Sequence, residues 1–162
     1  MISTNCGAFT VQVDSTISPK AAAAFVERVR IGFYDGLPFH RIAPGFVIQG
    51  GDPLGTGLGG PGYTTVDKPP VDQQYVRATV AMAKSPDQPS GAAGSQFFVI
   101  TGEDSQLTPD YAVLGEVTEG MATVDRISAE PVDSRSSIPG QAADGPPANP
   151  IVVKRATVKP AQ

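Results

Sequence analysis

Residues 39–52, which read FHRIAPGFVIQGGD, constrain the fold of this chain more than any other stretch. Residues 46–49 follow the pattern of a strand, and the Gly-Gly-Asp-Pro sequence after them predicts a sharp turn. An arginine (Arg41) and a glutamine (Gln49) lie among large apolar residues here, although arginine is mostly exposed in folded proteins. Burying such groups without partners costs several kcal/mol. The role of this stretch therefore depends on what lies against Arg41 and Gln49.

The rest of the chain reads as short strands joined by glycine- and proline-rich loops. It opens almost directly with strand-like sequence, and residues 9–13 alternate apolar and polar side chains, as in a half-buried strand. Residues 96–101 (QFFVIT) form the strongest predicted strand, because they are aromatic and β-branched and glycines bound them. Further strands are predicted at residues 79–83, 112–117 and 151–158, and a long loop at residues 131–150.

Two helices are predicted, one before the opening stretch and one near the C-terminal end. Ser18 is placed as the N-cap of the first helix and Pro19 as its first residue. An apolar stripe then faces a core, and Gly32 can end the helix in a left-handed conformation. The stripe consists of Ala22, Phe25, Val26 and Val29. The second helix follows Gly120 and carries its own short apolar stripe.

Many short strands with only two helices predict a mainly β protein, folded as a single domain over residues 1–162. A closed antiparallel barrel and a sandwich both fit this pattern. In a barrel, each helix would cover one open end and seal a small core.

A glycine-rich segment at residues 55–63, GTGLGGPGY, follows the opening stretch. It matches the G-x-G-x-x-G pattern of dinucleotide-binding loops, but the strand-then-helix context is missing and Pro61 stands where a helix would begin. A surface loop is the better interpretation, in which glycines adopt positive φ angles or allow close backbone approach.

Composition and charge argue against several classes of function. The net charge of −4 does not favour a nucleic-acid-binding surface. One cysteine (Cys6) and one histidine (His40) permit no internal disulfide and leave zinc without its usual ligands, so we expect no metal. No apolar run is long enough to span a membrane. A complete chain would therefore be expected in the cytoplasm, whereas a domain of a longer membrane-anchored or secreted protein stays open as an alternative.

Five motifs together resemble one family, the cyclophilins, which are peptidyl-prolyl cis-trans isomerases. In order, they are FHRIAPGFVIQGGD, GTGLGGPGY, VAMAK, GSQFFVIT and LTPDYAVLGEV. The resemblance covers nearly the whole chain, and the loops look like those of bacterial members. It implies a closed eight-stranded antiparallel β-barrel capped by two α-helices, with its substrate site on the outer face of the sheet. It also implies an enzyme that rotates Xaa-Pro peptide bonds in protein substrates and assists their folding.

The resemblance also assigns roles to individual residues. Arg41 takes the position of the family's catalytic arginine. The residues that would bind the substrate are Phe46, Val47, Gln49, Gly55, Ala83, Lys84, Gln96, Phe98, Leu107 and Tyr111. Leu107 and Tyr111 would close a pocket for proline. Ala83 and the backbone of Lys84 would pair with an extended peptide.

Four positions depart from the usual residues. Val47 stands where the family usually has methionine, so this wall of the pocket is smaller. The other three depart from the best-known eukaryotic pattern. Lys84 replaces an asparagine, but the contact there is largely through the backbone. Tyr111 replaces a histidine but keeps a flat ring with a polar tip, so activity should survive with an altered substrate preference. Gln106 replaces a tryptophan that contacts cyclosporin, so we expect this drug to bind only weakly.

The chemistry of this reaction needs no cofactor and no cluster of catalytic groups. Rotation about an Xaa-Pro bond breaks no covalent bond, and its barrier is amide resonance, ~18–20 kcal/mol for peptide bonds generally. An apolar slot can hold the proline ring, while a donor aimed at the proline nitrogen stabilises the twisted amide more than the planar one. Arg41 is the candidate donor, and Gln49 can hold it in place.

Neighbouring residues receive structural interpretations. His40 is expected to be a satisfied, partly buried histidine that faces the barrel interior, with no role as a base because the reaction transfers no proton. Side chains alternate along a strand, so Phe98 would line the outer site and Phe97 the core. Asp52 is expected to be solvated or to form the turn.

Two other functions stay open beside the isomerase. One is a non-catalytic module or chaperone that docks proline-containing segments, which would share the pocket but lack turnover. The other is a barrel that carries a small ligand inside, as lipocalins do, which a packed interior would argue against. For the isomerase, the expected partners are proline-containing peptides and unfolded proteins, and nothing in the sequence indicates more than a monomer.

Overall fold

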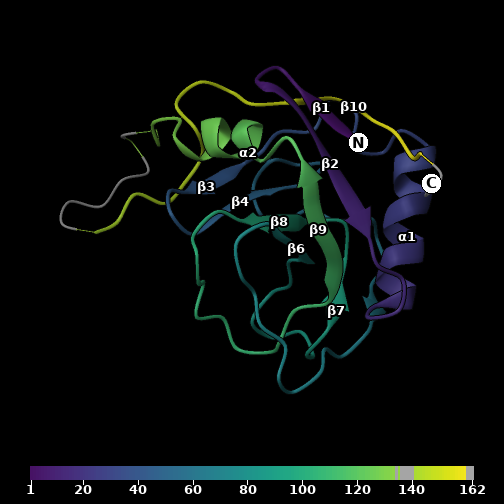
Figure 1. The fold of residues 1–162 in the computed structure, drawn as a ribbon. Helices are drawn as coiled ribbons and strands as arrows, with labels where there is room; N and C mark the ends of the chain where they lie inside the picture. The colour runs from purple at the N-terminus through teal and green to yellow at the C-terminus, as the bar shows by residue number, and fades with distance from the viewer. Residues whose placement is uncertain (134, 136–140, 160–162) are drawn as a thin grey trace.

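The fold is known from a computed structural model, which describes residues 1–133, 135 and 141–159. Part of the predicted loop at residues 131–150 and the end of the predicted domain, residues 160–162, therefore lie outside the described residues. The architecture is mainly β: one large antiparallel sheet curves into a barrel, with the two helices at different ends of it (Figure 1).

Eight strands form the large sheet. In spatial order they are β10 (Val153–Ala156), β1 (Ile2–Thr4), β2 (Gly7–Val13), β9 (Val113–Glu119), β6 (Thr79–Met82), β8 (Phe97–Ile100), β4 (Val47–Gly50) and β3 (Arg41–Ala43). A small second sheet pairs β5 (Thr65–Val66) with β7 (Ala92–Ala93). The helices are α1 (Pro19–Arg30) and α2 (Met121–Ser128).

Barrel closure differs from the prediction. The ladder ends at β10 on one side and β3 on the other, and these two edge strands are not neighbours in the described sheet. An isolated bridge between Pro38 and Val152 ties the adjoining segments, where the Phe39 N–H donates to the Ile151 carbonyl at 2.9 Å. Pro38 has no N–H with which to extend a ladder. Strand number and direction are therefore as predicted, but the barrel is half-closed.

The first helix begins and ends as predicted but is capped differently. Ser18 precedes Pro19, yet its hydroxyl makes no capping hydrogen bond. The carboxylate of Asp67 instead accepts the N–H of Ala21 at 2.7 Å, which ties α1 to the segment after β5. Gly32 has a φ of +73° just beyond the helix, as a left-handed cap requires. Neither α1 nor any other helix of the described residues is long and apolar enough to cross a membrane.

Strands β3, β5 and β7 were not predicted. Each has only two or three residues, which is too short for an alternating pattern to stand out. Strand β3 exists because it pairs with β4, and this register sets Arg41 directly opposite Gln49. The pairing therefore gives the first answer to what lies against these two polar residues.

Hydrophobic side chains cover both faces of the sheet. Along β8, Phe97 and Val99 join the inner core, whereas Phe98 and Ile100 join a second cluster on the outer face, as the alternation predicted. Phe25 of α1 packs into the inner core with Phe97. Large side chains fill the barrel interior, which argues against a ligand carried inside it. The outer cluster leaves an apolar surface on which a site can form.

Candidate active site

An open pocket of about 490 Å³ lies on the outer face of the sheet. We call it the Arg41 pocket. The predicted site residues that line it are Arg41, Phe46, Val47, Gln49, Ala83, Lys84, Phe98, Leu107 and Tyr111. They come from strands β3, β4 and β8, from the turn between β3 and β4, and from the loops that follow β6 and β8. The fold therefore brings together residues that lie up to 70 positions apart in sequence (111 − 41 = 70).

Aromatic rings form one wall of the Arg41 pocket, at the place where Tyr111 was predicted to close it. The Phe98 and Tyr111 rings meet edge to face, with centroids 5.3 Å apart and planes at 90°. Tyr75, which sequence reasoning missed, fixes this wall from behind: its hydroxyl donates to the Tyr111 carbonyl at 2.7 Å and accepts the Tyr111 N–H at 2.9 Å. Tyr75 is only 2% exposed, so these bonds satisfy a buried hydroxyl. They also hold Tyr111 in position.

The Arg41 guanidinium lies at the edge of this pocket and is held on two sides. Its Nε and Nη2 donate to the two carboxylate oxygens of Asp144, each at 2.7 Å, and its Nη1 donates to Gln49 Oε1 at 3.1 Å. The hydrogen bond with Asp144 raises the pKa of Arg41, while burial opposes that rise. Asp144 is the second partner of Arg41, and sequence reasoning missed it because it lies in the long loop near the C-terminus.

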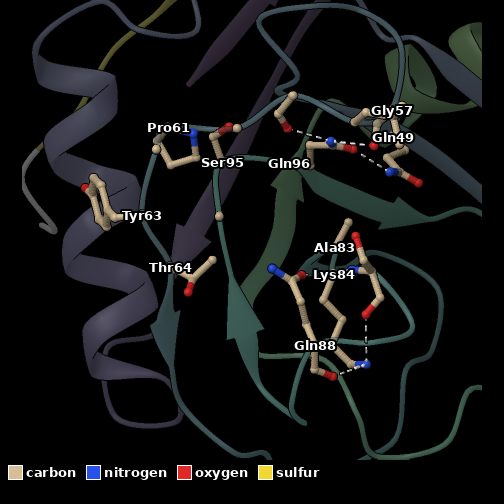
Figure 2. Close-up of a pocket in the computed structure, with 16 residues that line it drawn as sticks. Gln49, Gly57, Pro61, Tyr63, Thr64, Ala83, Lys84, Gln88, Ser95 and Gln96 are labelled. Carbon is tan, nitrogen blue, oxygen red and sulfur yellow. Dashed lines mark hydrogen bonds between the residues drawn. The ribbon is translucent and has the colours of Figure 1, made fainter.

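The amide of Gln49 connects the Arg41 pocket to a second open pocket of about 440 Å³ (Figure 2). Gln49 Nε2 donates to Gln96 Oε1 at 2.9 Å, and Gln96 Nε2 donates to the carbonyls of Gly57 and Gly59 at 2.9 and 2.8 Å. We call this second space the Gln96 pocket, because Gln96 lines it and does not line the Arg41 pocket. Gly55 is exposed and lines neither pocket, whereas Gly57 lines both.

Asp52 anchors the glycine-rich loop between the two pockets. It is fully buried and accepts the N–H groups of Leu54, Thr56 and Gly57 at 2.7, 2.9 and 2.6 Å. Burial raises the pKa of Asp52, but the loop N–H donors outweigh it and hold that pKa below its ordinary value. The expectation of a solvated carboxylate is therefore wrong and that of a turn-forming one is right, because positive φ angles such as +86° at Gly57 curl the loop around it.

Lys84 lines both pockets, yet its side chain is only 6% exposed. Its ammonium contacts the Asp110 carboxylate at 2.6 Å, donates to the Gln88 carbonyl at 3.2 Å and lies 5.8 Å from the centre of the Tyr111 ring. These contacts tie the Lys84 ammonium to neighbouring groups of the protein (Figure 2). Next to it, the Ala83 N–H donates to the Gln96 carbonyl at 2.9 Å.

His40 differs from its predicted role. It lines the Arg41 pocket and is half-buried, and neither ring nitrogen has a hydrogen-bond partner among the described residues. The expectation of a satisfied histidine facing the barrel interior is therefore wrong. The inward-facing residue is its neighbour Phe39, which belongs to the inner core. Burial lowers the pKa of His40, although the charge of Asp52 opposes that effect.

At the pH where an exposed histidine is half protonated, we expect less than half of His40 to be protonated. Its lowered pKa means that unfolding takes up a proton as the pH falls through ~6.5, the ordinary pKa of histidine, so the free energy of unfolding should decline there. Ring NMR signals report this directly, because His40 is the only histidine of the chain. A titration midpoint at or above ~6.5 would contradict the expectation, and His40→Gln should remove this part of the pH dependence.

The arrangement combines an apolar slot with a fixed cation. Within the described part of the chain, no three histidine, cysteine or carboxylate side chains gather into a group that could hold a metal ion. The polar groups around the slot include a guanidinium with its carboxylate partner, an imidazole, two primary amides and the backbone edge at Ala83 and Lys84. Such a site can bind an apolar ring and direct N–H donors at an atom beside it.

Fold and site together define a class: a half-closed antiparallel barrel whose outer face carries an apolar pocket edged by an arginine. A family model described as cyclophilin type peptidyl-prolyl cis-trans isomerase/CLD matches residues 1–158. The chain belongs to this family, as the motifs predicted.

Relatives and solved structures agree with this assignment. A probable peptidyl-prolyl cis-trans isomerase A of Mycobacterium leprae is 39% identical over 129 residues, covering 78% of this chain and 64% of that protein. A peptidyl-prolyl cis-trans isomerase of Arabidopsis thaliana is 31% identical over 134 residues and 82% of each chain. A cyclophilin type isomerase of Cryptosporidium parvum, solved in the presence of the dipeptide Ala-Pro, has a TM-score of 0.84 and 29% identity, covering 99% of this chain and 98% of that chain. The mycobacterial match spans less than two thirds of that relative's own length.

Proposed function

We propose that this chain catalyses rotation about Xaa-Pro peptide bonds in proline-containing peptides and unfolded proteins, and so assists their folding. Arg41 is the catalytic residue, and the substrate-binding residues are the other predicted site residues that line the Arg41 pocket, together with Gln96. The observation that carries the proposal is a guanidinium held at the edge of an apolar pocket by two partners. Membership of a family of isomerases supports it.

The pocket would hold the proline ring while the chain on the other side of the bond turns. Phe98 and Tyr111 offer rings, and Leu107 an aliphatic contact, to the apolar side of the proline. When the amide twists and loses resonance, its nitrogen regains a lone pair that can accept a hydrogen bond. A guanidinium N–H aimed at that nitrogen stabilises the twisted state more than the planar one, which is what catalysis requires.

The substrate chain would lie along the edge formed by Ala83 and Lys84. Because the Ala83 N–H already donates to Gln96, an extended peptide would use the Ala83 carbonyl and the Lys84 backbone. The Lys84 ammonium is held by the Asp110 carboxylate, so the side chain would not compete with a peptide for this backbone edge. The Ala-Pro dipeptide present with the Cryptosporidium parvum relative supports a substrate of this kind.

The test is the exchange of a short Ala-Pro-containing peptide between its cis and trans forms, followed by NMR. Uncatalysed exchange takes tens to hundreds of seconds, so catalysis shows as line broadening or exchange cross-peaks at low protein concentration. A non-catalytic binding module would shift the peptide signals without accelerating exchange. Binding with an unchanged exchange rate would therefore replace the isomerase with that alternative.

Cyclosporin is expected to bind this chain weakly. Gln106 is exposed, and a glutamine offers neither the apolar area nor the indole donor of a tryptophan. Gln106→Trp should therefore tighten binding by about tenfold, since one large aromatic contact is worth ~1–2 kcal/mol. Calorimetric titration of both proteins measures this. Tight binding by the native chain, or no gain in Gln106→Trp, would show that Gln106 does not limit the interaction.

The chain is proposed to act as a monomer in a reducing compartment such as the cytoplasm. The large exposed apolar residues of the described chain run from Met1 to Val158, six of them between Leu54 and Val76, and no two are adjacent in sequence. Single exposed apolar residues are normal in monomers. The lone thiol of Cys6 needs no oxidising environment. Light scattering in solution tests the first statement, and fractionation of cells that express the protein tests the second.

A further inference from the structure

The long loop near the C-terminus reaches back to the Arg41 pocket at one point, Asp144. Both oxygens of its carboxylate accept hydrogen bonds from Nε and Nη2 of Arg41, which lies 103 residues earlier in the sequence. This is the paired, planar geometry in which arginine and carboxylate interact most strongly. Asp144 and the adjacent Gly145 are also part of the pocket lining.

The backbone places Asp144 there. Gly145 forms an antiparallel bridge with Ile42: the Ile42 N–H donates to the Gly145 carbonyl at 2.7 Å, and the Gly145 N–H donates to the Ile42 carbonyl at 3.1 Å. The segment is held on its other side too, because the Asp133 N–H donates to the Pro146 carbonyl at 2.9 Å. Ile42 points into the inner core, so its neighbour Arg41 points outward, and Asp144 meets it on that face.

Asp144 leaves part of the guanidinium available. Arginine has five N–H donors, and three of them are used, two by Asp144 and one by Gln49. The remaining two belong to Nη1 and Nη2, the terminal nitrogens. The long side chain of Arg41 would otherwise move among several rotamers, because it is 36% exposed. Clamping one edge thus orients the free donors without blocking them.

We infer that Asp144 is a positioning residue for Arg41, which fixes the guanidinium edge that faces a bound proline. The inference rests on the proposed isomerase function. Asp144 also partly neutralises the charge of Arg41, which would act against catalysis. Orientation outweighs this effect, since charges at a half-exposed site are screened by water whereas a small misplacement of a catalytic group can cost up to ~100-fold in rate.

Three substitutions test the inference against Asp125→Asn. Asp125 lies in α2, and its two carboxylate oxygens accept from Arg77 Nη2 at 2.7 Å. Its side chain is 48% exposed and lines neither pocket, so it is a matched control. Asp144→Ala should lower kcat about tenfold and leave KM within about twofold. Asp144→Asn should lose nearly as much, because an amide offers only one acceptor oxygen. Asp144→Glu keeps the paired carboxylate and should recover a larger share of kcat than Asp144→Asn.

Two further measurements separate positioning from a general structural effect. The Arg41 Nε–H signal should exchange slowly with water in the native protein and quickly in Asp144→Ala, while the melting temperature stays the same because this ion pair is half-exposed. In an Arg41→Ala background, Asp144→Ala should cause no further loss of activity, since it acts only through Arg41.

Several outcomes would overturn the inference. Unchanged or increased kcat in Asp144→Ala would mean that the carboxylate is neutral or inhibitory. A full additional loss in the Arg41→Ala background would mean that it acts by another route. An inactive native protein would overturn the proposed function instead, and the Nε–H exchange, which needs no activity, would still decide whether Asp144 holds Arg41.

Discussion

Arg41→Ala is expected to lower kcat/KM for proline isomerisation about 100-fold, with most of the loss in kcat. A hydrogen bond to a charged group contributes ~1.5–3 kcal/mol, and each tenfold of rate corresponds to ~1.4 kcal/mol. The apolar wall of Phe98, Leu107 and Tyr111 stays intact, so the proline should still bind. Exchange NMR on the Ala-Pro-containing peptide, at several peptide concentrations, separates the two parameters.

Arg41→Lys shows whether charge alone suffices. Lysine keeps the positive charge but has no planar fork with which to contact Asp144 and Gln49 together. It should therefore lose about tenfold in kcat, between the native protein and Arg41→Ala. The control is Arg135→Ala, which removes another Asp-paired arginine whose side chain is 88% exposed and lines neither pocket. Full activity in Arg41→Ala would disprove the role of a donor to the proline nitrogen.

Local sequence patterns predicted most of the fold. Alternation separated Phe97 from Phe98, and helix signals at Pro19, Gly32 and Gly120 fell at or next to the observed ends. These features depend on neighbours in sequence, which is why they can be read from it. The motifs likewise brought most of the site residues to one pocket, because each motif is a strand or loop of fixed register.

What escaped prediction depends on contacts between distant segments. The carboxylate of Asp144 and the hydroxyl of Tyr75 act on residues 103 and 36 positions away, and neither stands in a pattern that marks it. The same holds for Asp67, which caps α1 although it lies 46 positions after Ala21 in sequence. His40 was misplaced because the backbone between Pro38 and β3 is neither strand nor helix, so a period could not be assumed.

Phe97→Ala and Phe98→Ala should damage the protein in different ways, although the two residues are adjacent on β8. Phe97 is 1% exposed and its ring meets Phe25, Tyr34 and Phe39 at centroid distances of 5.6, 5.7 and 6.0 Å. Its removal leaves a cavity at the centre of the barrel, and such truncations cost ~3–5 kcal/mol. Phe98 belongs to the outer cluster and lines an open pocket, so its removal enlarges that pocket and leaves no closed cavity.

The expected result is a crossed pattern. Phe97→Ala should lower the free energy of unfolding by about 4 kcal/mol, measured by urea denaturation, while the folded fraction keeps its kcat/KM. Phe98→Ala should raise KM about tenfold, since it removes a ring that meets both proline and Tyr111, with a smaller loss of stability. If Phe97→Ala does not fold, Phe97→Leu tests the same face of the sheet with a smaller loss of stability. Equal losses of activity in both variants would mean that the two faces of the sheet are not independent, and that the outer pocket takes its shape from the core beneath it.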